Sequence, residues 1–329
     1  MNTSAKPTRV VTIGGGTGQF TLLSGLKKYP LKLKAVVSMA DDGGSTGVLR
    51  DELGVLPPGD IRQCLVALSE ADQIMRELWN FRFDQGGLAG HSFGNIFLST
   101  LEKITGSFEE AVRVSSLTLK ISGEVIPVTT QSVTLVCGYA ERTTGENAIN
   151  LGVIKDRESI RLEPEVQGNP RAIEALEQAD CIVIGPGNLY CSIIPNFLVQ
   201  GVAEAVKNSR ARVIYNCNLM TKAGHTDNFT VSDFVREIER FVGVGRVNFV
   251  TCNDYQKLEE DLLKKYAFEG EYPVRVDNNG LTGTSYKMLM SDLVSRDVPT
   301  QKKGDPLKRT LIRHNPNALA ELIIKNCLG

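Results

Sequence analysis

Residue types that mark several protein classes are scarce in this sequence. Only three histidines occur among the 329 residues, His91, His225 and His314, and there is no HExxH motif, which argues against a histidine-rich metal site. The seven cysteines include no CxxC pair, so we expect reduced, buried thiols rather than a disulfide framework. No apolar run approaches the ~18 residues that span a bilayer, and the amino terminus lacks the apolar stretch of a signal peptide.

An excess of charge of one sign is also missing. The chain has 37 Lys and Arg against 38 Asp and Glu, so nothing in its net charge favours nucleic acid or an anionic membrane. Hydrophobic residues make up 42% and charged residues 23%, as in ordinary globular proteins. We therefore expect a cytoplasmic protein with no membrane insertion and no nucleic-acid partner.

The pattern of apolar residues predicts an α/β fold. Residues 10–13 form a β-branched run that stops at glycines, residues 20–26 have helical spacing, and residues 33–39 read as a second strand. A second βαβ pattern comprises strand 181–184, helix 194–208 and strand 212–215. Further helices are expected at 61–71 (capped by Gly59 and Asp60), 92–101, 107–117, 170–178, 231–241, 258–265 and 317–325, and further strands at 133–139, 161–166, 247–251 and 273–276.

This alternation of strands and helices indicates a mostly parallel sheet with helices on both faces, a three-layer arrangement with smaller additional elements. We expect one large α/β domain over 1–329, with a phosphate-binding half at about 8–130 and a second βαβ half at about 131–329.

The first candidate site is the glycine-rich turn after the first strand, Gly14-Gly15-Gly16-Thr17-Gly18. Glycines let the backbone approach a ligand, and the helix that follows offers free N–H groups to a phosphate. The turn is not the dinucleotide fingerprint, because position 19 is Gln, and it is not a P-loop, because no Gly-Lys-Ser/Thr follows. A tight turn without a ligand is the alternative.

A second small-residue loop follows the second strand. Asp41 and Asp42 lie where a ribose hydroxyl is often bound, and they are also candidate ligands of Mg²⁺ bridging phosphates. A solvated turn is the alternative. Gly43, Gly44, Ser45 and Thr46 complete this loop as candidate ligand contacts.

Later segments add candidates for the same crevice. Arg62 is either a phosphate ligand or a surface arginine, and Asp60 is interpreted as a helix cap. His91 and Asn95 are four residues apart and share a face at a helix start. The loop after the strand at 181–184 contributes Gly185, Pro186, Gly187, Asn188 and Tyr190, and residues 216–221 and 224–227 could line the crevice too.

Taken together, these motifs closely resemble the YvcK-like gluconeogenesis factors, relatives of the 2-phospho-L-lactate transferases (CofD-like). The resemblance spans residues 10–320. The segments that carry it are Gly14-Gly-Gly-Thr-Gly18, Ala40-Asp-Asp-Gly-Gly-Ser-Thr-Gly47, Pro57-Pro-Gly-Asp-Ile-Arg62, Gly90-His-Ser-Phe-Gly-Asn95, Gly185-Pro-Gly-Asn-Leu-Tyr190 and Arg313-His314.

The resemblance implies a Rossmann-like fold that binds a nucleotide sugar such as UDP-N-acetylglucosamine or UDP-glucose. It further implies a role linking carbon metabolism to bacterial cell-wall synthesis and cell shape, with a protein partner that the sequence does not identify. It suggests base or sugar contacts at Tyr266 and Arg313. The transferase relatives use a guanine nucleotide, a deazaflavin acceptor and Mg²⁺. Gln19-Phe20 and the long loop at 41–50 place this chain in the gluconeogenesis-factor branch.

The chain departs from the branch pattern at two places. Asn188 and Cys191 stand where Ser and Thr are usual, and Lys222-Ala-Gly-His-Thr-Asp227 replaces Gln-Pro-Gly-Glu-Thr-Asp. Both changes leave the phosphate turn intact and bear on ligand preference.

Three functions remain open at this point. The favoured one is a nucleotide-sugar-binding regulator without turnover, because the sequence offers no convincing nucleophile–base pair and no residue is assigned a catalytic role. The second is a Mg²⁺-dependent phospho-group transferase. The third, an NAD-type oxidoreductase, is disfavoured by the missing fingerprint glycine. A homodimer is one option that the sequence leaves open.

Overall fold

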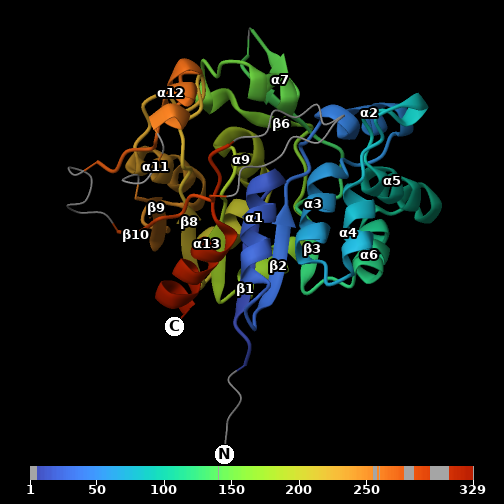
Figure 1. The fold of residues 1–329 in the computed structure, drawn as a ribbon, viewed down its shortest axis with the longest axis horizontal. Helices are drawn as coiled ribbons and strands as arrows, with labels where there is room; N and C mark the ends of the chain where they lie inside the picture. Colours follow the sequence, from blue (N-terminus) through green and yellow to red (C-terminus); the bar gives the residue numbers. More distant parts are fainter. Residues whose placement is uncertain are drawn as a thin grey trace, which may run out of the picture.

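The computed structural model describes residues 6–139, 141–254, 258, 260–277, 285–296 and 311–328. A seven-stranded parallel sheet with the order β10-β9-β8-β7-β1-β2-β3 forms its centre, and helices cover both faces (Figure 1). The expected three-layer Rossmann-like α/β fold is confirmed. The strands are β1 (Arg9–Gly14), β2 (Lys32–Val37), β3 (Glu124–Pro127), β7 (Cys181–Ile184), β8 (Arg212–Asn216), β9 (Phe249–Asn253) and β10 (Lys287–Ser291).

The helices follow the strands in the alternation that a parallel sheet requires. In the first half of the chain they are α1 (Gly16–Leu26), α2 (Gly44–Leu53), α3 (Gly59–Leu68), α4 (Gln73–Asn80), η1 (Gly86–Leu88), α5 (Phe93–Thr105) and α6 (Phe108–Leu119). In the second half they are α7 (Glu146–Leu151), η2 (Arg157–Ser159), α8 (Pro170–Glu177), η3 (Leu189–Ile193), α9 (Ile194–Phe197), α10 (Val202–Asn208), α11 (Val231–Val242), α12 (Glu260–Phe268), α13 (Pro316–Ile323) and η6 (Ile324–Leu328).

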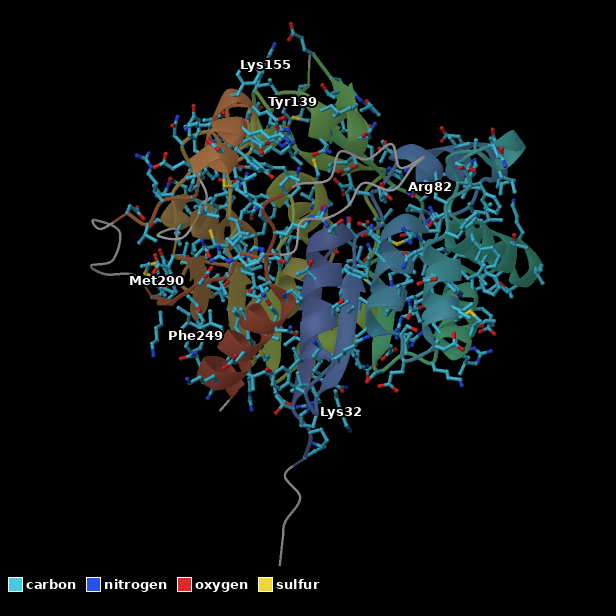
Figure 2. The ribbon with its side chains drawn as sticks, in the orientation of Figure 1. Lys32, Arg82, Tyr139, Lys155, Phe249 and Met290 are labelled. Atoms are coloured by element: carbon cyan, nitrogen blue, oxygen red, sulfur yellow. The ribbon has the colours of Figure 1, made fainter. Side chains whose placement is uncertain are left out.

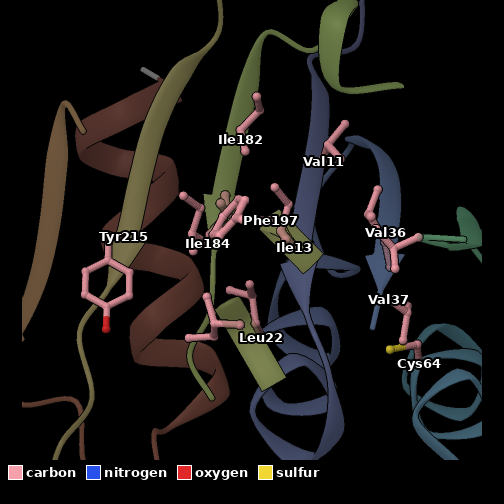
Figure 3. Packing of buried hydrophobic residues seen from close by; sticks show 14 of the residues in the cluster. Val11, Ile13, Leu22, Val36, Val37, Cys64, Ile182, Ile184, Phe197 and Tyr215 are labelled. Carbon is pink, nitrogen blue, oxygen red and sulfur yellow. The ribbon is translucent and has the colours of Figure 1, made fainter. Parts of the chain in front are cut away.

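The core lies on the two faces of the central strands. Ile13 of β1 and Ile184 of β7 are fully buried beside Leu22 of α1 (Figure 3). Strands buried on both faces become continuous apolar runs, which is why β1 and β7 were readable from the sequence. The six cysteines with described side chains are buried free thiols, as expected, whereas the side chain of Cys327 lies outside the described set.

A small antiparallel sheet stands apart from the main one, with the order β5-β4-β6. It contains β4 (Thr134–Cys137), β5 (Thr143–Thr144) and β6 (Arg161–Glu163). In Figure 2, Tyr139 and Lys155 of this region lie at the opposite end of the molecule from Lys32, where β2 begins. The small sheet and α7 therefore sit beyond the carboxyl ends of the parallel strands.

Several sequence expectations are wrong in detail. Residues 44–50 are helical in α2 rather than a loop, and the single helix expected at 194–208 is divided into α9 and α10. Gly201, with φ of 87°, stands before α10, and a left-handed residue interrupts a helix. Residues 273–276 form only isolated bridges, to Met220 and Thr230, instead of a sheet strand. Strands β3 and β10 and helices α4 and α7 were not anticipated.

Candidate functional site

The order in which successive strands are added to the sheet reverses between the neighbouring strands β1 and β7. From β1 the chain proceeds to β2 and β3 on one side, and from β7 it proceeds to β8, β9 and β10 on the other. Ligands of open α/β sheets bind at such a switch point, outside the carboxyl ends of the strands. The glycine-rich turn follows β1 and the Gly185–Gly187 loop follows β7, so both predicted loops lie at this point.

The two loops are in direct contact. A Cβ added to Gly18 would lie 2.0 Å from the carbonyl oxygen of Pro186, so only glycine permits this approach. Two amides at the end of β8 hold the second loop in place. Asn216 Nδ2 donates to the Gly185 carbonyl at 2.9 Å, and Asn218 Nδ2 donates to the Gly187 carbonyl at 2.8 Å.

The amino terminus of α1 carries no capping side chain. Its N-cap, Gly15, has none to offer, and Gly16 adopts φ of 59° in the left-handed region. The carboxylate of Asp60 faces this turn instead: the Gly16 backbone N–H donates to it. Asp60 is therefore not the cap of α3, as the sequence suggested, because the N-cap of α3 is Pro58 and no side chain caps that helix.

Asp41 and Asp42 point to different partners. Asp41 Oδ1 accepts the Gly43 N–H at 3.0 Å, and Asp41 Oδ2 would lie 2.5 Å from a Cβ on Gly59 at the start of α3. Asp42 Oδ1 instead accepts the Asn147 N–H at 2.8 Å, in the first turn of α7. In the described part of the chain, no three His, Cys, Asp or Glu side chains are grouped to hold a metal ion. The Mg²⁺ assignment to these two residues stays a prediction.

Burial and mutual repulsion perturb three carboxylates at this site. Burial, and then the charge of Asp41, raise the pKa of Asp60 to about 8. Burial, and then the charges of Asp41, Asp60 and Asp42, raise the pKa of Glu146 to about 8. The pKa of Asp41 is also raised, chiefly by burial. These shifts mark a place where negative charge is concentrated and partly withdrawn from water, which is typical of functional sites.

A hydrogen-bonded network extends from this cluster through α2 and α5. His91 Nδ1 lies 3.1 Å from Ser45 Oγ, and Asn95 Nδ2 donates to Ser45 Oγ at 3.2 Å. Asn95 Oδ1 in turn accepts from Arg62 Nε at 2.9 Å. Arg62 is only 8% exposed, so it is not a surface arginine. His91 precedes α5, whose N-cap is Ser92, so it does not share a helix face with Asn95, but both side chains contact Ser45.

The loop after β7 leads into a buried stretch. Asn188 Oδ1 accepts the backbone N–H groups of Tyr190 and Cys191, while its Nδ2 donates to Asn150 Oδ1 of α7 at 2.8 Å. Tyr190 is fully buried, and its hydroxyl donates to Glu237 Oε2 at 3.0 Å. The structure thus places Asn188 at the site and the Tyr190 ring in the core beneath it.

Tyr266 and Arg313 come from segments far apart in sequence that meet in space. The Tyr266 hydroxyl accepts the backbone N–H groups of Leu311 at 2.8 Å and Ile312 at 3.0 Å, directly before Arg313. Tyr266 is 6% exposed, so in this structure it orders the segment that carries Arg313. Their contacts with a base or sugar stay a prediction.

The segments after β8 also approach α7. His225 is fully buried, and its Nε2 lies 3.0 Å from the Ile149 carbonyl. Asn216 and Asn218 hold the Gly185–Gly187 loop, as described above. The two segments therefore contact the Gly185–Gly187 loop and α7, and their lining of a ligand crevice stays a prediction.

Gln19 occupies the position of the missing fingerprint glycine. Its side chain is 1% exposed, and its Nε2 donates to Thr12 Oγ1 at 3.0 Å and to the Val36 carbonyl at 3.1 Å. In dinucleotide-binding folds the third glycine lets the helix pack closely on the strand, whereas here a buried glutamine side chain ties α1 to β1 and β2. This contact disfavours the oxidoreductase hypothesis.

Two surface cavities lie elsewhere. One of about 610 Å³ lies at the amino ends of β1, β7 and β8, where Arg9 and Asp180 form an ion pair at 2.7 Å. Another of about 260 Å³ lies beside α6, β3 and α8, where Arg171 is paired with Glu124. Both have charged walls whose ion pairs are satisfied within the protein. The motif residues gather instead at the opposite, carboxyl edge of the sheet, so we place the site there.

Sequence reasoning missed two residues of this site. Asp60 was recognised but given a capping role, and Glu146 was not singled out. A carboxylate directly after Pro57-Pro58-Gly59, with another in the loop after β2, was a usable signal for Asp60. Glu146 lies on the short helix α7, whose placement depends on the Asp42 and Asn188 contacts described above, so no local pattern could have identified it.

Comparison with known proteins identifies relatives along nearly the whole chain. The family model described as 2-phospho-L-lactate transferase CofD matches residues 10–294. A gluconeogenesis factor of Listeria innocua is 43% identical over 98% of this chain and 97% of that protein. The gluconeogenesis factor of Bacillus subtilis is 35% identical over 96% of this chain and 97% of that protein.

A solved structure confirms the fold. A UPF0052 family protein from Bacillus halodurans superposes with a TM-score of 0.87 at 38% identity, covering 98% of this chain and 100% of that one. Within the described residues, no helix combines the length and apolar character needed to cross a membrane.

Proposed function

The chain belongs to the CofD family, among its gluconeogenesis factors, and from this premise we propose that it binds a nucleoside diphosphate sugar, such as UDP-N-acetylglucosamine or UDP-glucose, and acts as a regulator. In this proposal it couples carbon supply to cell-wall synthesis and cell shape through a protein partner. Six buried free thiols fit a reducing compartment such as the cytoplasm.

The observation that carries the proposal is the convergence of helix amino termini at the carboxyl edge of the sheet. The first turns of α1 and α3 meet through Gly16 and Asp60. The first turns of α2 and α3 meet through Thr46 and Gly59, where an added Cβ would lie 2.4 Å from Thr46 Oγ1. Apart from the Gly16 N–H, which donates to Asp60, the first turns of these helices present N–H groups without an intrahelical partner and roughly half a positive charge each, which is the arrangement that binds phosphate.

The remaining parts of the ligand follow from the placement of the other candidates. Asp41 or Asp42 would hold the ribose hydroxyls or a Mg²⁺ ion bound to the diphosphate, and Arg62 would add a buried positive charge. The Gly185–Asn188 loop would close the crevice from the side of β7. The segment at Arg313, which Tyr266 orders, would contact the base or the sugar.

Calorimetric titration tests this proposal. The protein is titrated with UDP-glucose, UDP-N-acetylglucosamine, UDP, GTP and NAD, with and without Mg²⁺. We expect heat with at least one UDP-sugar and none with NAD. A complete lack of heat at millimolar UDP-sugar, from protein shown to be folded by circular dichroism, would refute the proposal.

The acidic cluster favours a second function, transfer of a phosphorus-containing group. Burial and mutual repulsion raise the pKa values of Asp41, Asp60 and Glu146 beside the phosphate turn, and a Mg²⁺ ion that enters with the diphosphate would reduce this repulsion. The test is release of nucleoside monophosphate when an acceptor alcohol is added with Mg²⁺. Binding without any release leaves the regulator as the supported function.

A further inference from the structure

Ser45 and His91 form a pair that the sequence did not reveal. They are 46 residues apart, and Ser45 Oγ lies 3.1 Å from His91 Nδ1. This separation is within the range in which a base activates a hydroxyl nucleophile. Ser45 is 7% exposed and lies in the first turn of α2.

The neighbouring hydrogen bonds fix the orientation of the Asn95 amide at Ser45. Arg62 Nε can only donate, so the Asn95 atom it contacts at 2.9 Å is the carbonyl oxygen. The Asn95 amide nitrogen therefore faces Ser45 and donates to its Oγ at 3.2 Å. Oγ keeps its own hydrogen and a second lone pair for His91 Nδ1, so the direction of this contact follows the tautomer of His91.

The contact gives Ser45 a general base in the tautomer of His91 that carries the ring proton on Nε2. With Nδ1 accepting, the ring proton resides on Nε2, so Nδ1 holds a free lone pair for the Ser45 proton. Arg62 and Asn95 thus act as orienting groups, in the manner of the third member of a catalytic triad. Gly94 permits the close packing, since a Cβ there would lie 2.7 Å from Arg62 Cδ.

Ser45 lies beside the proposed diphosphate site. The next residue, Thr46, contacts Gly59 at the start of α3, and Asp60 follows Gly59 and faces the glycine turn. A diphosphate held by the amino termini of α1, α2 and α3 would therefore have the Ser45 hydroxyl at its edge. The free N–H groups of the same helices would stabilise the charge that develops on the phosphate oxygens.

We propose that Ser45 is a nucleophile that attacks an anhydride phosphorus of the bound nucleoside diphosphate sugar, with His91 as the general base. The Ser45 Oγ–P bond forms, the Oγ proton passes to His91 Nδ1, and the P–O bond to the other phosphate breaks. That phosphate leaves as nucleoside monophosphate or sugar phosphate, taking the proton back from His91. Water then releases the group from Ser45, again with His91 as base.

The inference rests on the proposed nucleotide-sugar site and adds a slow covalent turnover to it. Intact-protein mass spectrometry tests it. The protein is mixed with UDP-glucose or UDP-N-acetylglucosamine and Mg²⁺, quenched in acid and mapped by peptide. We expect an adduct on Ser45 with the mass of a uridylyl or a sugar phosphoryl group.

Variants separate this chemistry from a structural role. Ser45→Ala should abolish the adduct and the release of monophosphate. His91→Ala should slow adduct formation by about 10²- to 10⁴-fold, and added imidazole should partly restore it. Ser99→Ala on α5 is the matched control: the Ser99 hydroxyl is buried and has no hydrogen-bond partner within the described structure, so the rates should not change.

The outcomes separate the proposed chemistry of Ser45 from the proposed binding of a nucleotide sugar. Binding by calorimetry without any adduct or monophosphate release overturns the Ser45 chemistry and leaves the proposed function standing. An adduct on another residue, or turnover that persists in Ser45→Ala, also overturns it. Should Ser45→Ala fail to fold, peptide mapping of the wild-type adduct still decides. Absence of binding refutes the proposed function itself.

Discussion

The carboxylate of Asp60 lies against the backbone of Gly15: a Cβ built on Gly15 would be 2.4 Å from Asp60 Oδ2. This contact brings the start of α3 against the start of α1. A side chain at position 15 would occupy the place of the Asp60 carboxylate. Because the neighbour is the end of a side chain rather than backbone, a Gly15→Ala substitution would displace Asp60 instead of preventing folding.

We expect Gly15→Ala to fold with near-normal stability and to bind nucleotide sugar at least ~10-fold more weakly, about 1.4 kcal/mol. The measurement is calorimetric titration alongside thermal unfolding. Gly87→Ala provides the control, since an added Cβ there meets nothing within 4 Å. Equal affinity in the two variants would show that the turn does not contact the ligand.

Gly18→Ala should destabilise the protein because the obstacle is backbone. An added Cβ would lie 2.0 Å from the Pro186 carbonyl oxygen, and about two turns further along α1 a Cβ on Gly25 would lie 2.0 Å from the Pro316 carbonyl oxygen. Overpacking of this kind costs about 1–3 kcal/mol, so both variants should lower the urea midpoint. Only Gly18→Ala should also weaken ligand binding under conditions where both are folded.

The amide pair of Asn188 and Asn150 connects the loop after β7 to α7. A double-mutant cycle with Asn188→Ala, Asn150→Ala and the double variant should give a coupling free energy of about 0.5–1.5 kcal/mol in urea unfolding. Asn188 Oδ1 also caps η3, and the cycle subtracts the free energy that is lost with this cap in the single variant. Additive effects would show that the two amides do not stabilise each other.

How far the sequence predicted the fold depended on the local signal. Strands β1 and β7 were identified because four consecutive apolar or β-branched residues end at glycines. Strand β3 was missed because Glu124-Val-Ile-Pro127 is short and ends in proline, which suits an edge strand. Helix α2 was interpreted as a loop because its first turn, Gly44-Ser-Thr-Gly47, consists of poor helix formers.

The candidate site shows the same limit at longer range. The glycine turn and the Gly185 loop were predicted, since position after a strand is a local property. The partners of Asp42 and Ser45 were not, because Asn147 and His91 are 105 and 46 residues away, respectively. Contacts across such distances are set by the order of strands in the sheet, which no local pattern specifies.

Removing the Asp60 charge should stabilise the ligand-free protein at alkaline pH. The folded-state pKa of Asp60, about 8, lies above its ordinary value of 3.8, so folding favours the protonated form. This contribution to stability is fully present below pH 3.8 and is lost as the pH rises through 8. In chelator-containing buffer, the free energy of unfolding of Asp60→Asn should therefore increase relative to that of wild type as the pH rises from 5 to 8.

The exposed Asp51→Asn on α2 is the control for this experiment. Its pH dependence should follow that of wild type. If Asp60→Asn lost stability relative to wild type over the same interval, the carboxylate would be stabilised by a partner rather than destabilised by burial and by the charge of Asp41.

His314 should make the protein sensitive to acid. It is 8% exposed, and burial lowers its pKa from 6.5 to about 4, although a hydrogen bond to the Cys217 backbone opposes this. The unfolded chain therefore binds a proton between pH 6.5 and 4 that the folded protein refuses. Stability is complete above pH 6.5 and falls as the pH drops, by on the order of 3 kcal/mol at pH 4.

Urea unfolding of wild type and His314→Asn between pH 4 and pH 8 measures this dependence. The variant should be less stable at pH 7, because the contact with Cys217 is altered, but its stability should decline less steeply in acid. Burial also lowers the pKa of His225, so this residue contributes to the loss of stability in acid in both proteins. Parallel pH curves for the two proteins would assign the acid sensitivity to His225 and the carboxylates instead, and would show that His314 is protonated as readily in the folded chain as in the unfolded one.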